Sequence, residues 1–201
     1  MDKIQEAARL LRRGGVCVIP TETGYGLAAS IERPKALERI YKIKQRPLDK
    51  PLLILVEAIG KAPVESGQIS ACASLLMERF WPGPLTLLLP AAKGLPFPLT
   101  GDTGRIGVRV SSHPVASALV RAVGTPITAT SANISGRPLP KSIKEVKEQL
   151  KEAPDYFLDA GTIAPGPAST ILDVTVIPPK IVRQGAISGA DILAVCGKGP
   201  A

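Results

Sequence analysis

Residues that commonly carry catalysis and metal binding are scarce in this sequence. Its 201 residues include one histidine and three cysteines, and aromatic residues make up 3% of the chain. Because Cys17, Cys72 and Cys196 are widely spaced and form no CxxC pair, neither a zinc site nor a disulfide framework is expected. Cys17 lies within an apolar run and is predicted to be a buried thiol. This cysteine usage indicates a reducing, cytoplasmic location.

Long apolar runs and the common nucleotide-binding motifs are also missing. No stretch reaches the roughly 18 apolar residues that a membrane-spanning helix needs, and the N-terminus is polar, so no membrane association is expected. The patterns GxxxxGK[ST], GxGxxG, HExxH and GxSxG are all absent. Any bound nucleotide must therefore be held by another arrangement of residues.

The residues that are present form an apolar and basic chain. Hydrophobic residues make up 45% of it, so a substantial core of Leu, Ile, Val and Ala is possible without metals. The 25 Lys and Arg against 17 Asp and Glu give a net charge of +8. This balance favours polyanionic partners such as nucleotides, RNA or anionic lipid, although a simple basic surface fits equally well. The length predicts one domain over residues 1–201.

Apolar periodicity predicts helices and strands that are mixed along the chain. Helices are predicted over 4–11, 34–41, 69–80 and 114–123, from the capping-box serine at 142 to about 152, and from about 190. Strands are predicted at 16–19, 52–56, 85–89, 106–110, 126–130, 156–158, 170–174 and 181–183. We therefore expect an α/β protein of the α+β type, with one twisted mixed sheet flanked by helices. The Gly- and Pro-rich segments 94–103 and 161–167 are expected to be mobile loops.

Short polar side chains follow two of the predicted strands. Thr21, Thr23 and Tyr25 come directly after the strand at 16–19, where they could orient a small ligand or simply form a turn. Ser131 and Asn133 follow the strand at 126–130, and a turn of this kind could hold a phosphate.

Three cations are grouped in a loop bounded by prolines. Lys44, Arg46 and Lys50 can converge on one anion if the chain is extended there, and Pro47 favours extended backbone at Arg46. For Lys44 alone, a solvated helix end is an equally good interpretation. Two further arginines, at 109 and 183, interrupt apolar strands, so each is either a surface residue at a strand end or a planar fork for a carboxylate.

The single histidine does not suggest a catalytic base. His113 directly precedes Pro114 at a predicted helix start, which is typical of a turn or capping residue. Without a Cys/His pair, covalent nucleophilic catalysis is not expected. Positioning and charge stabilisation remain, and these suit a reaction at phosphorus.

Taken in order, these segments resemble the YrdC-like family of threonylcarbamoyl-adenylate synthases. The shared motifs extend over nearly the whole chain and are Pro20-Thr21-Glu22-Thr23, Tyr25-Gly26-Leu27, Lys44-x-Arg46-Pro47, Lys50-Pro51-Leu52, Trp81-Pro82-Gly83-Pro84-Leu85-Thr86, Gly107-Val108-Arg109, Thr130-Ser131-Ala132-Asn133, Ser135-Gly136, Ser169-Thr170 and Arg183-x-Gly185. No single motif is decisive, but their order is very specific.

The resemblance implies a reaction and a set of partners. L-threonine, bicarbonate and ATP, with Mg²⁺, would give threonylcarbamoyl-AMP and pyrophosphate for the threonylcarbamoyladenosine modification of tRNA. Downstream tRNA threonylcarbamoyl-transfer proteins would take up the product, and contact with tRNA or double-stranded RNA is possible. The family fold implies a concave, positively charged cavity. Since about sixteen residues follow Gly185, the chain resembles the short, single-domain form.

The resemblance also implies roles for individual residues, and none of them binds a metal. Thr23, Arg109 and Ser169 would bind threonine, with Arg109 on its carboxylate, while Thr21 and Tyr25 would form the pocket wall. The family's catalytic signature corresponds to Lys44, Arg46, Ser131 and Asn133. The residues that would face ATP are Arg46, Lys50, Ser131 and Arg183.

Three positions depart from the family pattern. Gly24 replaces a common β-branched residue next to Thr23, and Ser111 replaces a frequent proline after Val110. Leu55 offers no polar contact where some relatives have histidine. None of these departures removes a proposed charged group.

Two other functions are compatible with the sequence. A double-stranded RNA- or tRNA-binding or ribosome-associated factor would also have a basic concave surface, and its affinity would fall steeply with salt. A carbamoyl-transfer module related to hydrogenase maturation proteins would depend on carbamoyl phosphate. The second alternative lacks its usual acylphosphatase-like and zinc-finger companions in this sequence.

Overall fold

The first of two β-sheets is built around a hairpin that the sequence analysis treated as a polar turn. The computed structural model describes residues 2–65, 67–164 and 166–197. In the order β7-β2-β1-β8, this sheet contains β7 (Thr130–Ser131), β2 (Gly24–Ala28), β1 (Cys17–Thr21) and β8 (Tyr156–Phe157). Strands β1 and β2 pair antiparallel, and β8 lies parallel to β1. Thr21 therefore ends one strand, and Tyr25 lies on the next.

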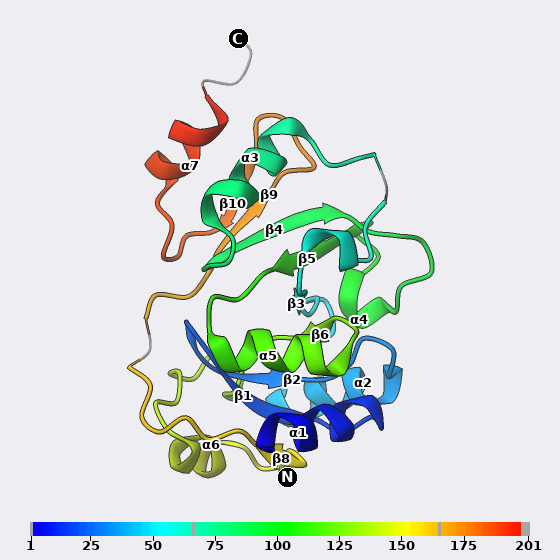
Figure 1. The fold of residues 1–201 in the computed structure, drawn as a ribbon, viewed down its shortest axis with the longest axis vertical. Helices are drawn as coiled ribbons and strands as arrows, with labels where there is room; N and C mark the ends of the chain where they lie inside the picture. Colours follow the sequence, from blue (N-terminus) through cyan, green and yellow to red (C-terminus); the bar gives the residue numbers. More distant parts are fainter. Residues whose placement is uncertain (1, 66, 165, 198–201) are drawn as a thin grey trace.

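The second sheet contains six strands and is also mixed. Its order is β10-β9-β4-β5-β3-β6, and the strands are β10 (Lys180–Arg183), β9 (Thr170–Asp173), β4 (Leu85–Pro90), β5 (Arg105–Arg109), β3 (Ile54–Leu55) and β6 (Ile127–Thr128). Parallel pairs β9–β4 and β5–β3 alternate with antiparallel ones. Figure 1 shows the first sheet with the N-terminal helices and the second sheet beneath α3 and α7.

The predicted fold of mixed strands flanked by helices is confirmed, although the strands form two sheets rather than one, and one segment explains the division. The predicted strand at 126–130 is split: β6 pairs with β3 in the second sheet, while β7 pairs with β2 in the first. Between them, the Ala129 amide donates to Leu53 O at 3.0 Å. The chain thus passes from one sheet to the other within five residues that have no obvious break in their apolar pattern.

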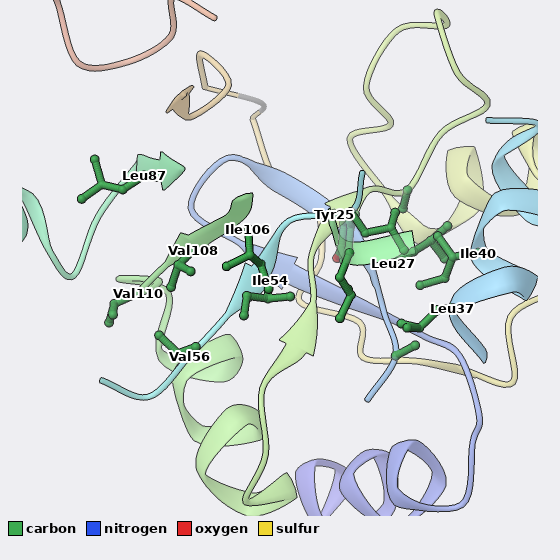
Figure 2. Close-up of a cluster of buried hydrophobic side chains, with 14 of the residues drawn as sticks. Tyr25, Leu27, Leu37, Ile40, Ile54, Val56, Leu87, Ile106, Val108 and Val110 are labelled. Carbon is green, nitrogen blue, oxygen red and sulfur yellow. The ribbon is translucent and has the colours of Figure 1, made fainter. Parts of the chain in front are cut away.

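Helices cover both faces of the first sheet. Helices α1 (Lys3–Arg12) and α5 (Pro114–Val123) pack on the face that carries Ile19, and α2 (Pro34–Lys44) packs on the opposite face with Val18. Successive residues of β1 belong to different apolar clusters because strand side chains alternate between faces. The larger cluster continues from α2 to the second sheet, as Figure 2 shows.

The remaining helices agree with the sequence in most places. They are the 3₁₀ helix η1 (Ile59–Lys61), α3 (Ala71–Phe80), α4 (Phe97–Thr100), α6 (Ile143–Gln149) and α7 (Gly189–Cys196). Ser142 caps α6 by accepting from the Glu145 amide at 3.3 Å, although this helix ends earlier than the predicted 152. Helix α4 lies within the segment 94–103 that was predicted as a loop.

A disulfide between α3 and α7 contradicts the expectation drawn from cysteine spacing. Cys72 and Cys196 are bonded, with a Cα–Cα distance of 5.1 Å and a sequence separation of 124 residues. Wide spacing along the chain did not prevent this bond, because α7 packs on α3 and brings Cys196 next to Cys72. Cys17 is a buried free thiol, as predicted. None of the helices in the described ranges has the length and apolar character required to span a bilayer.

Candidate active site

A basic cavity lies where the two sheets meet. Its volume is about 800 Å³, within the usual range for small-molecule sites. The charged residues that line it are Arg46, Asp49, Lys50, Arg105, Arg109 and Arg183. Five cations thus surround one carboxylate, which favours a polyanionic ligand. The predicted site residues that line it are Thr21, Thr23, Tyr25, Arg46, Lys50, Arg109, Ser131, Ser169 and Arg183, and those that do not are Lys44 and Asn133.

The three cations of the proline-bounded loop do not converge on one point. Arg46 and Lys50 line the cavity, whereas Lys44 is 1% exposed and lies behind its wall. Lys44 ends α2 on the helix's buried side, and the left-handed conformation of Gln45, with a φ of 49°, turns the chain away from the helix axis. Arg46 donates from Nε to Lys50 O at 2.9 Å and from Nη2 to Pro51 O at 3.0 Å. Its guanidinium therefore closes this loop and also contributes charge to the cavity.

The Lys44 ammonium is enclosed by oxygens of the turn after β7. Nζ donates to Asn133 O at 2.9 Å and to Asn133 Oδ1 at 3.0 Å, and it also contacts the carbonyl of Ser131. Burial and the charge of Arg46 lower the pKa of Lys44 to about 7, although these oxygens favour the protonated form. In the reverse direction, the Ser135 amide donates to Lys44 O at 2.9 Å. Lys44 thus fixes the turn that carries Ser131.

Ser131 presents its hydroxyl at the cavity wall. It lies on β7 opposite Gly26, and its Oγ donates to Asn133 Oδ1 at 2.6 Å. Asn133 is buried, and its amide donates to Arg137 O. The structure therefore brings Lys44, Ser131 and Asn133 together as the sequence predicted, with Ser131 alone among them facing the cavity.

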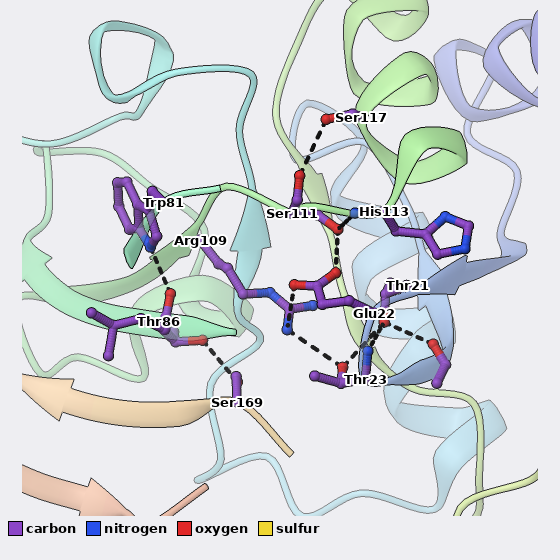
Figure 3. A network of polar contacts seen from close by, with 12 residues as sticks. Thr21, Glu22, Thr23, Trp81, Thr86, Arg109, Ser111, His113, Ser117 and Ser169 are labelled. Carbon is purple, nitrogen blue, oxygen red and sulfur yellow. Dashed lines mark hydrogen bonds and ion pairs between the residues drawn. The ribbon is translucent and has the colours of Figure 1, made fainter. Parts of the chain in front are cut away.

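On the other side of the cavity, Arg109 is the centre of a polar network (Figure 3). It is 6% exposed, its Nη1 donates to Thr23 Oγ1 at 3.4 Å, and the same nitrogen lies 3.5 Å from Glu22 Oε1. Burial lowers the pKa of Arg109, and the Glu22 carboxylate opposes that change. Thr21 Oγ1 donates to Gly24 O at 2.7 Å and lies 3.1 Å from Thr23 Oγ1, so it shapes the hairpin turn that positions Thr23.

Ser169 and Arg183 form a second polar pair across the cavity. Arg183 Nη2 donates to Ser169 O at 2.7 Å and to Ser169 Oγ at 2.9 Å, and Thr86 Oγ1 lies 3.0 Å from the same hydroxyl. Burial, then repulsion from Arg109 and Arg46, lowers the pKa of Arg183. All three guanidinium groups line the same cavity.

The close approach of chain segments beside Arg183 depends on a glycine. A Cβ at Gly185 would overlap the carbonyl oxygen of Ala168. The Ala186 amide donates to that oxygen at 2.9 Å, so this contact joins the end of β10 to the start of β9. The Arg183-x-Gly185 motif therefore combines a cation of the cavity wall with the backbone fit that holds it.

Tyr25 and His113 have structural partners. The Tyr25 hydroxyl donates to Gly161 O at 2.7 Å and accepts from the Ala160 amide at 3.0 Å, which fixes this segment at the cavity wall. His113 Nδ1 accepts from the Val115 amide at 3.2 Å and so caps α5. The prediction that His113 is a capping residue is confirmed.

Sequence reasoning missed Arg105, which lines the cavity and forms an ion pair with Asp173. The signal was the alternation along β5, because Arg105, Gly107 and Arg109 lie on one face of the strand and all line the cavity. Sequence reasoning also gave no role to Glu22, although it lies within a quoted motif. Among the described residues, no group of three His, Cys, Asp or Glu side chains could hold a metal ion.

The fold and the site define a class of protein: an α/β protein with a basic cavity, whose described wall carries hydroxyl and arginine side chains and no nucleophile–base pair. The chain belongs to the Sua5/YciO/YrdC family, because the family model described as "Telomere recombination" matches residues 9–185.

Curated relatives of known name share this family. The threonylcarbamoyl-AMP synthase of Pyrococcus abyssi is 38% identical over 98% of this chain and 58% of its own length. The threonylcarbamoyl-AMP synthase of Bacillus subtilis is 38% identical over 97% of this chain and 57% of its own length. The chain thus spans less than two thirds of the length of these two relatives. It covers 100% of the threonylcarbamoyl-AMP synthase of Photobacterium profundum, at 33% identity over 92% of this chain.

Solved structures agree with the fold. The crystal structure of P. abyssi Sua5 complexed with L-threonine matches with a TM-score of 0.91 at 38% identity, covering 98% of this chain and 58% of that one. E. coli YciO matches with a TM-score of 0.82 at 31% identity, covering 94% and 92%. Full-length HypF matches with a TM-score of 0.74 over 92% of this chain and 29% of its own, and at 22% identity this likeness shows the fold alone.

Proposed function

We propose that this chain is a threonylcarbamoyl-AMP synthase, a nucleotidyltransferase that uses L-threonine, bicarbonate and ATP. The observation that carries the proposal is the cavity, in which five cations and one carboxylate surround hydroxyl groups from several strands. The names of the relatives from P. abyssi and P. profundum support the same activity. The P. abyssi structure complexed with L-threonine supports the amino-acid substrate.

Threonine is proposed to bind beside β5. Arg109 offers a buried guanidinium for the α-carboxylate, and Thr23 lies within 3.4 Å of it. A planar guanidinium matches a carboxylate through two parallel hydrogen bonds. Ser169, held by Arg183 and Thr86, completes this side of the cavity.

ATP is proposed to lie against Arg46, Lys50, Ser131 and Arg183, and Mg²⁺ enters with it as MgATP. Mg²⁺ is usually bound by one or two carboxylates together with substrate phosphates. Asp49 is the one carboxylate in the described cavity wall, so the ion would be held mainly by the phosphates of ATP. Lys44 and Asn133 do not line the cavity, and we assign them the role of fixing Ser131.

The proposed reaction needs no side-chain nucleophile. Bicarbonate takes up a proton and gives CO₂ and water. The neutral threonine amine attacks this CO₂ and loses a proton to give a carbamate, whose oxygen attacks the α-phosphorus of ATP. A bond forms between the carbamate oxygen and the α-phosphorus, while the bond to the pyrophosphate oxygen breaks. Arg46 and Lys50 stabilise the charge that develops on the attacking and leaving oxygens. The product would then pass, in the cytoplasm, to the proteins that transfer threonylcarbamoyl to tRNA.

The test is pyrophosphate release by the purified protein from MgATP, with L-threonine and bicarbonate each present or omitted. Release that requires both substrates is the expected result. Mass spectrometry of the adenylate product identifies the threonylcarbamoyl group.

A different pattern would contradict the proposal. Release that is independent of threonine and bicarbonate, or no release in any mixture, would overturn it. In that case, salt-dependent and ATP-independent affinity for tRNA would support an RNA-binding factor instead.

A further inference from the structure

Glu22 is a partly buried residue whose carboxylate has no direct use in the proposed chemistry. It lies in the turn between β1 and β2, its side chain is 15% exposed, and it does not line the cavity. Oε2 accepts from the Ser111 hydroxyl, and Oε1 lies 3.5 Å from Arg109 Nη1 (Figure 3). Within the described residues, Oε1 has no hydrogen-bond partner. Since a charged oxygen removed from water is costly unless it is paired, the placement of Oε1 beside Arg109 requires an explanation.

The charges around Arg109 supply the explanation. Arg109 is almost fully buried, and it lies near enough to Arg183 to lower the pKa of that residue, as Arg46 also does. Repulsion among these cations favours conformations in which they move apart. Glu22 is the anionic group beside Arg109, and it approaches from the side away from the cavity lining. It can therefore hold the guanidinium in place before any substrate arrives.

The guanidinium nitrogens of Arg109 differ in their partners. Both Thr23 Oγ1 and Glu22 Oε1 contact Nη1, and no hydrogen bond from Nε or Nη2 is found in the part of the chain that the structure describes. We propose that Glu22 is a positioning residue, which holds Nη1 of Arg109 so that the remaining donors face the α-carboxylate of the amino-acid substrate. This inference rests on the proposed function and adds a residue to its threonine subsite.

Ser111 extends the same arrangement to α5. Its hydroxyl donates to Glu22 and accepts from the His113 amide at 3.2 Å, and its carbonyl accepts from Ser117 Oγ at 3.2 Å. Ser111 stands where the family pattern frequently has a proline, and a proline has no hydroxyl to donate. This chain therefore holds its Glu22 through a contact that depends on its own serine.

The experiment compares Glu22→Gln and Ser111→Ala with the wild-type protein in pyrophosphate release, with KM measured for each substrate. Glu22→Gln removes the charge but keeps the shape, so we expect KM for L-threonine to rise about tenfold. The kcat and the KM for ATP should change by less than about twofold. Ser111→Ala should raise KM for L-threonine in the same direction by about threefold. Glu152→Gln is the matched control, since Glu152 pairs with Arg39 on the exposed surface at 3.0 Å.

The outcomes separate this inference from the proposed function. If the wild-type protein releases no pyrophosphate, the proposed function fails and this inference fails with it. If the wild-type protein is active and Glu22→Gln retains its KM for L-threonine, the inference alone is overturned. An equal rise in the KM values for L-threonine and ATP, or a fall in kcat alone, would indicate a structural role for Glu22 and would also overturn the inference. If Glu22→Gln does not fold, an unchanged KM for L-threonine in Ser111→Ala overturns the inference.

Discussion

The cations of the cavity have different partners, so similar substitutions are expected to have different effects. Arg46 is held by carbonyls of its own loop, Arg183 by Ser169, and Arg109 by Glu22. Lys44 does not line the cavity, and its ammonium group is held by oxygens of Ser131 and Asn133. The identity of a charged residue therefore does not reveal whether it binds the ligand, closes a loop or fixes a turn.

Arg46 combines two of these roles, and its substitution should show both. Arg46→Ala removes a cavity charge and the two hydrogen bonds to Lys50 O and Pro51 O. We expect kcat for pyrophosphate release to fall about a hundred- to a thousandfold, as for loss of one group that stabilises transition-state charge. Arg46→Lys keeps the charge but loses the planar, two-pronged geometry of the guanidinium. Its kcat should therefore lie between those of the wild type and Arg46→Ala. Steady-state kinetics with thermal unfolding as a folding check would measure this.

Arg39 provides the control for Arg46. It lies on α2, pairs with Glu152 and Asp155 away from the cavity, and is partly exposed. Arg39→Ala should leave kcat within about twofold of the wild type, because surface pairs contribute little. Wild-type turnover in Arg46→Ala would contradict the ligand role of Arg46.

Lys44 makes a prediction about pH. In the folded protein the pKa of Lys44 is lowered to about 7, whereas the unfolded chain keeps its ordinary value near 10.5. Between these values the unfolded state binds more protons, so the free energy of unfolding should rise with pH in that window. Lys44→Met lacks this titration. The free energy of unfolding of the wild type, minus that of Lys44→Met, should therefore rise between about pH 7 and pH 10. Urea unfolding at several pH values measures this difference. A difference that does not change with pH would contradict the lowered pKa of Lys44.

At the scale of elements, the site is built from turns and strand ends of both sheets. The turn between β1 and β2 carries Thr23, and the passage from β6 to β7 leads to Ser131. The contact at Gly185 joins β10 to the start of β9 beside Ser169. Ligand groups therefore come from strand ends whose positions depend on pairing in both sheets.

The disulfide between α3 and α7 is expected to stabilise this end of the molecule. A bond that closes a loop of 124 residues reduces the conformational freedom of the unfolded chain. Reduction, or Cys196→Ser, should lower the free energy of unfolding by about 2–4 kcal/mol and Tm by roughly 5–15 °C. Scanning calorimetry with and without dithiothreitol measures this effect.

The variant itself supplies the control for the disulfide. Dithiothreitol should have no further effect on Cys196→Ser, because Cys17 forms no bond. No residue of α7 lines the cavity in the described structure, so kcat at room temperature should remain unchanged. Equal melting temperatures for the oxidised and reduced wild-type protein would show that the disulfide does not stabilise the fold.

At the scale of the whole molecule, the chain has a net charge of +8, and the cavity wall is also basic, with five cations and one carboxylate. Charge alone did not distinguish a nucleotide enzyme from an RNA-binding factor. The cavity volume of about 800 Å³ does favour a small ligand, because an RNA helix is too wide to fit into a cavity of this size.

The cavity charge predicts a salt effect that differs between substrates. Raising KCl from about 50 mM to about 500 mM shortens the screening length from roughly 14 Å to roughly 4 Å. KM for ATP, a polyanion, should therefore rise several-fold, whereas KM for L-threonine, a zwitterion, should change little. Initial-rate kinetics at each salt concentration would test this, and an equal effect on both substrates would argue against the assignment of the cations to ATP.

Local sequence patterns determined most of the helices and strands. The apolar spacing of α1, the glycine after α5 and the Pro34 start of α2 each predicted an element that the structure confirms. These elements are readable because hydrophobic periodicity and capping act over a few residues. The ordered motifs also predicted nine of the residues that line the cavity. These motifs were readable because the polar side chains and glycines of each turn are close together in the sequence.

Tertiary structure alone decided which of these residues meet. Lys44 is buried behind Ser131, Arg105 reaches the cavity, and Cys72 bonds Cys196 across 124 residues. The division of the 126–130 segment between two sheets likewise left no mark in its apolar pattern. Such outcomes depend on contacts between residues far apart in the chain, and the sequence pattern around each residue contains no record of its distant partner. The sequence thus determined the elements and the candidate ligands, and long-range packing decided which of them form the site.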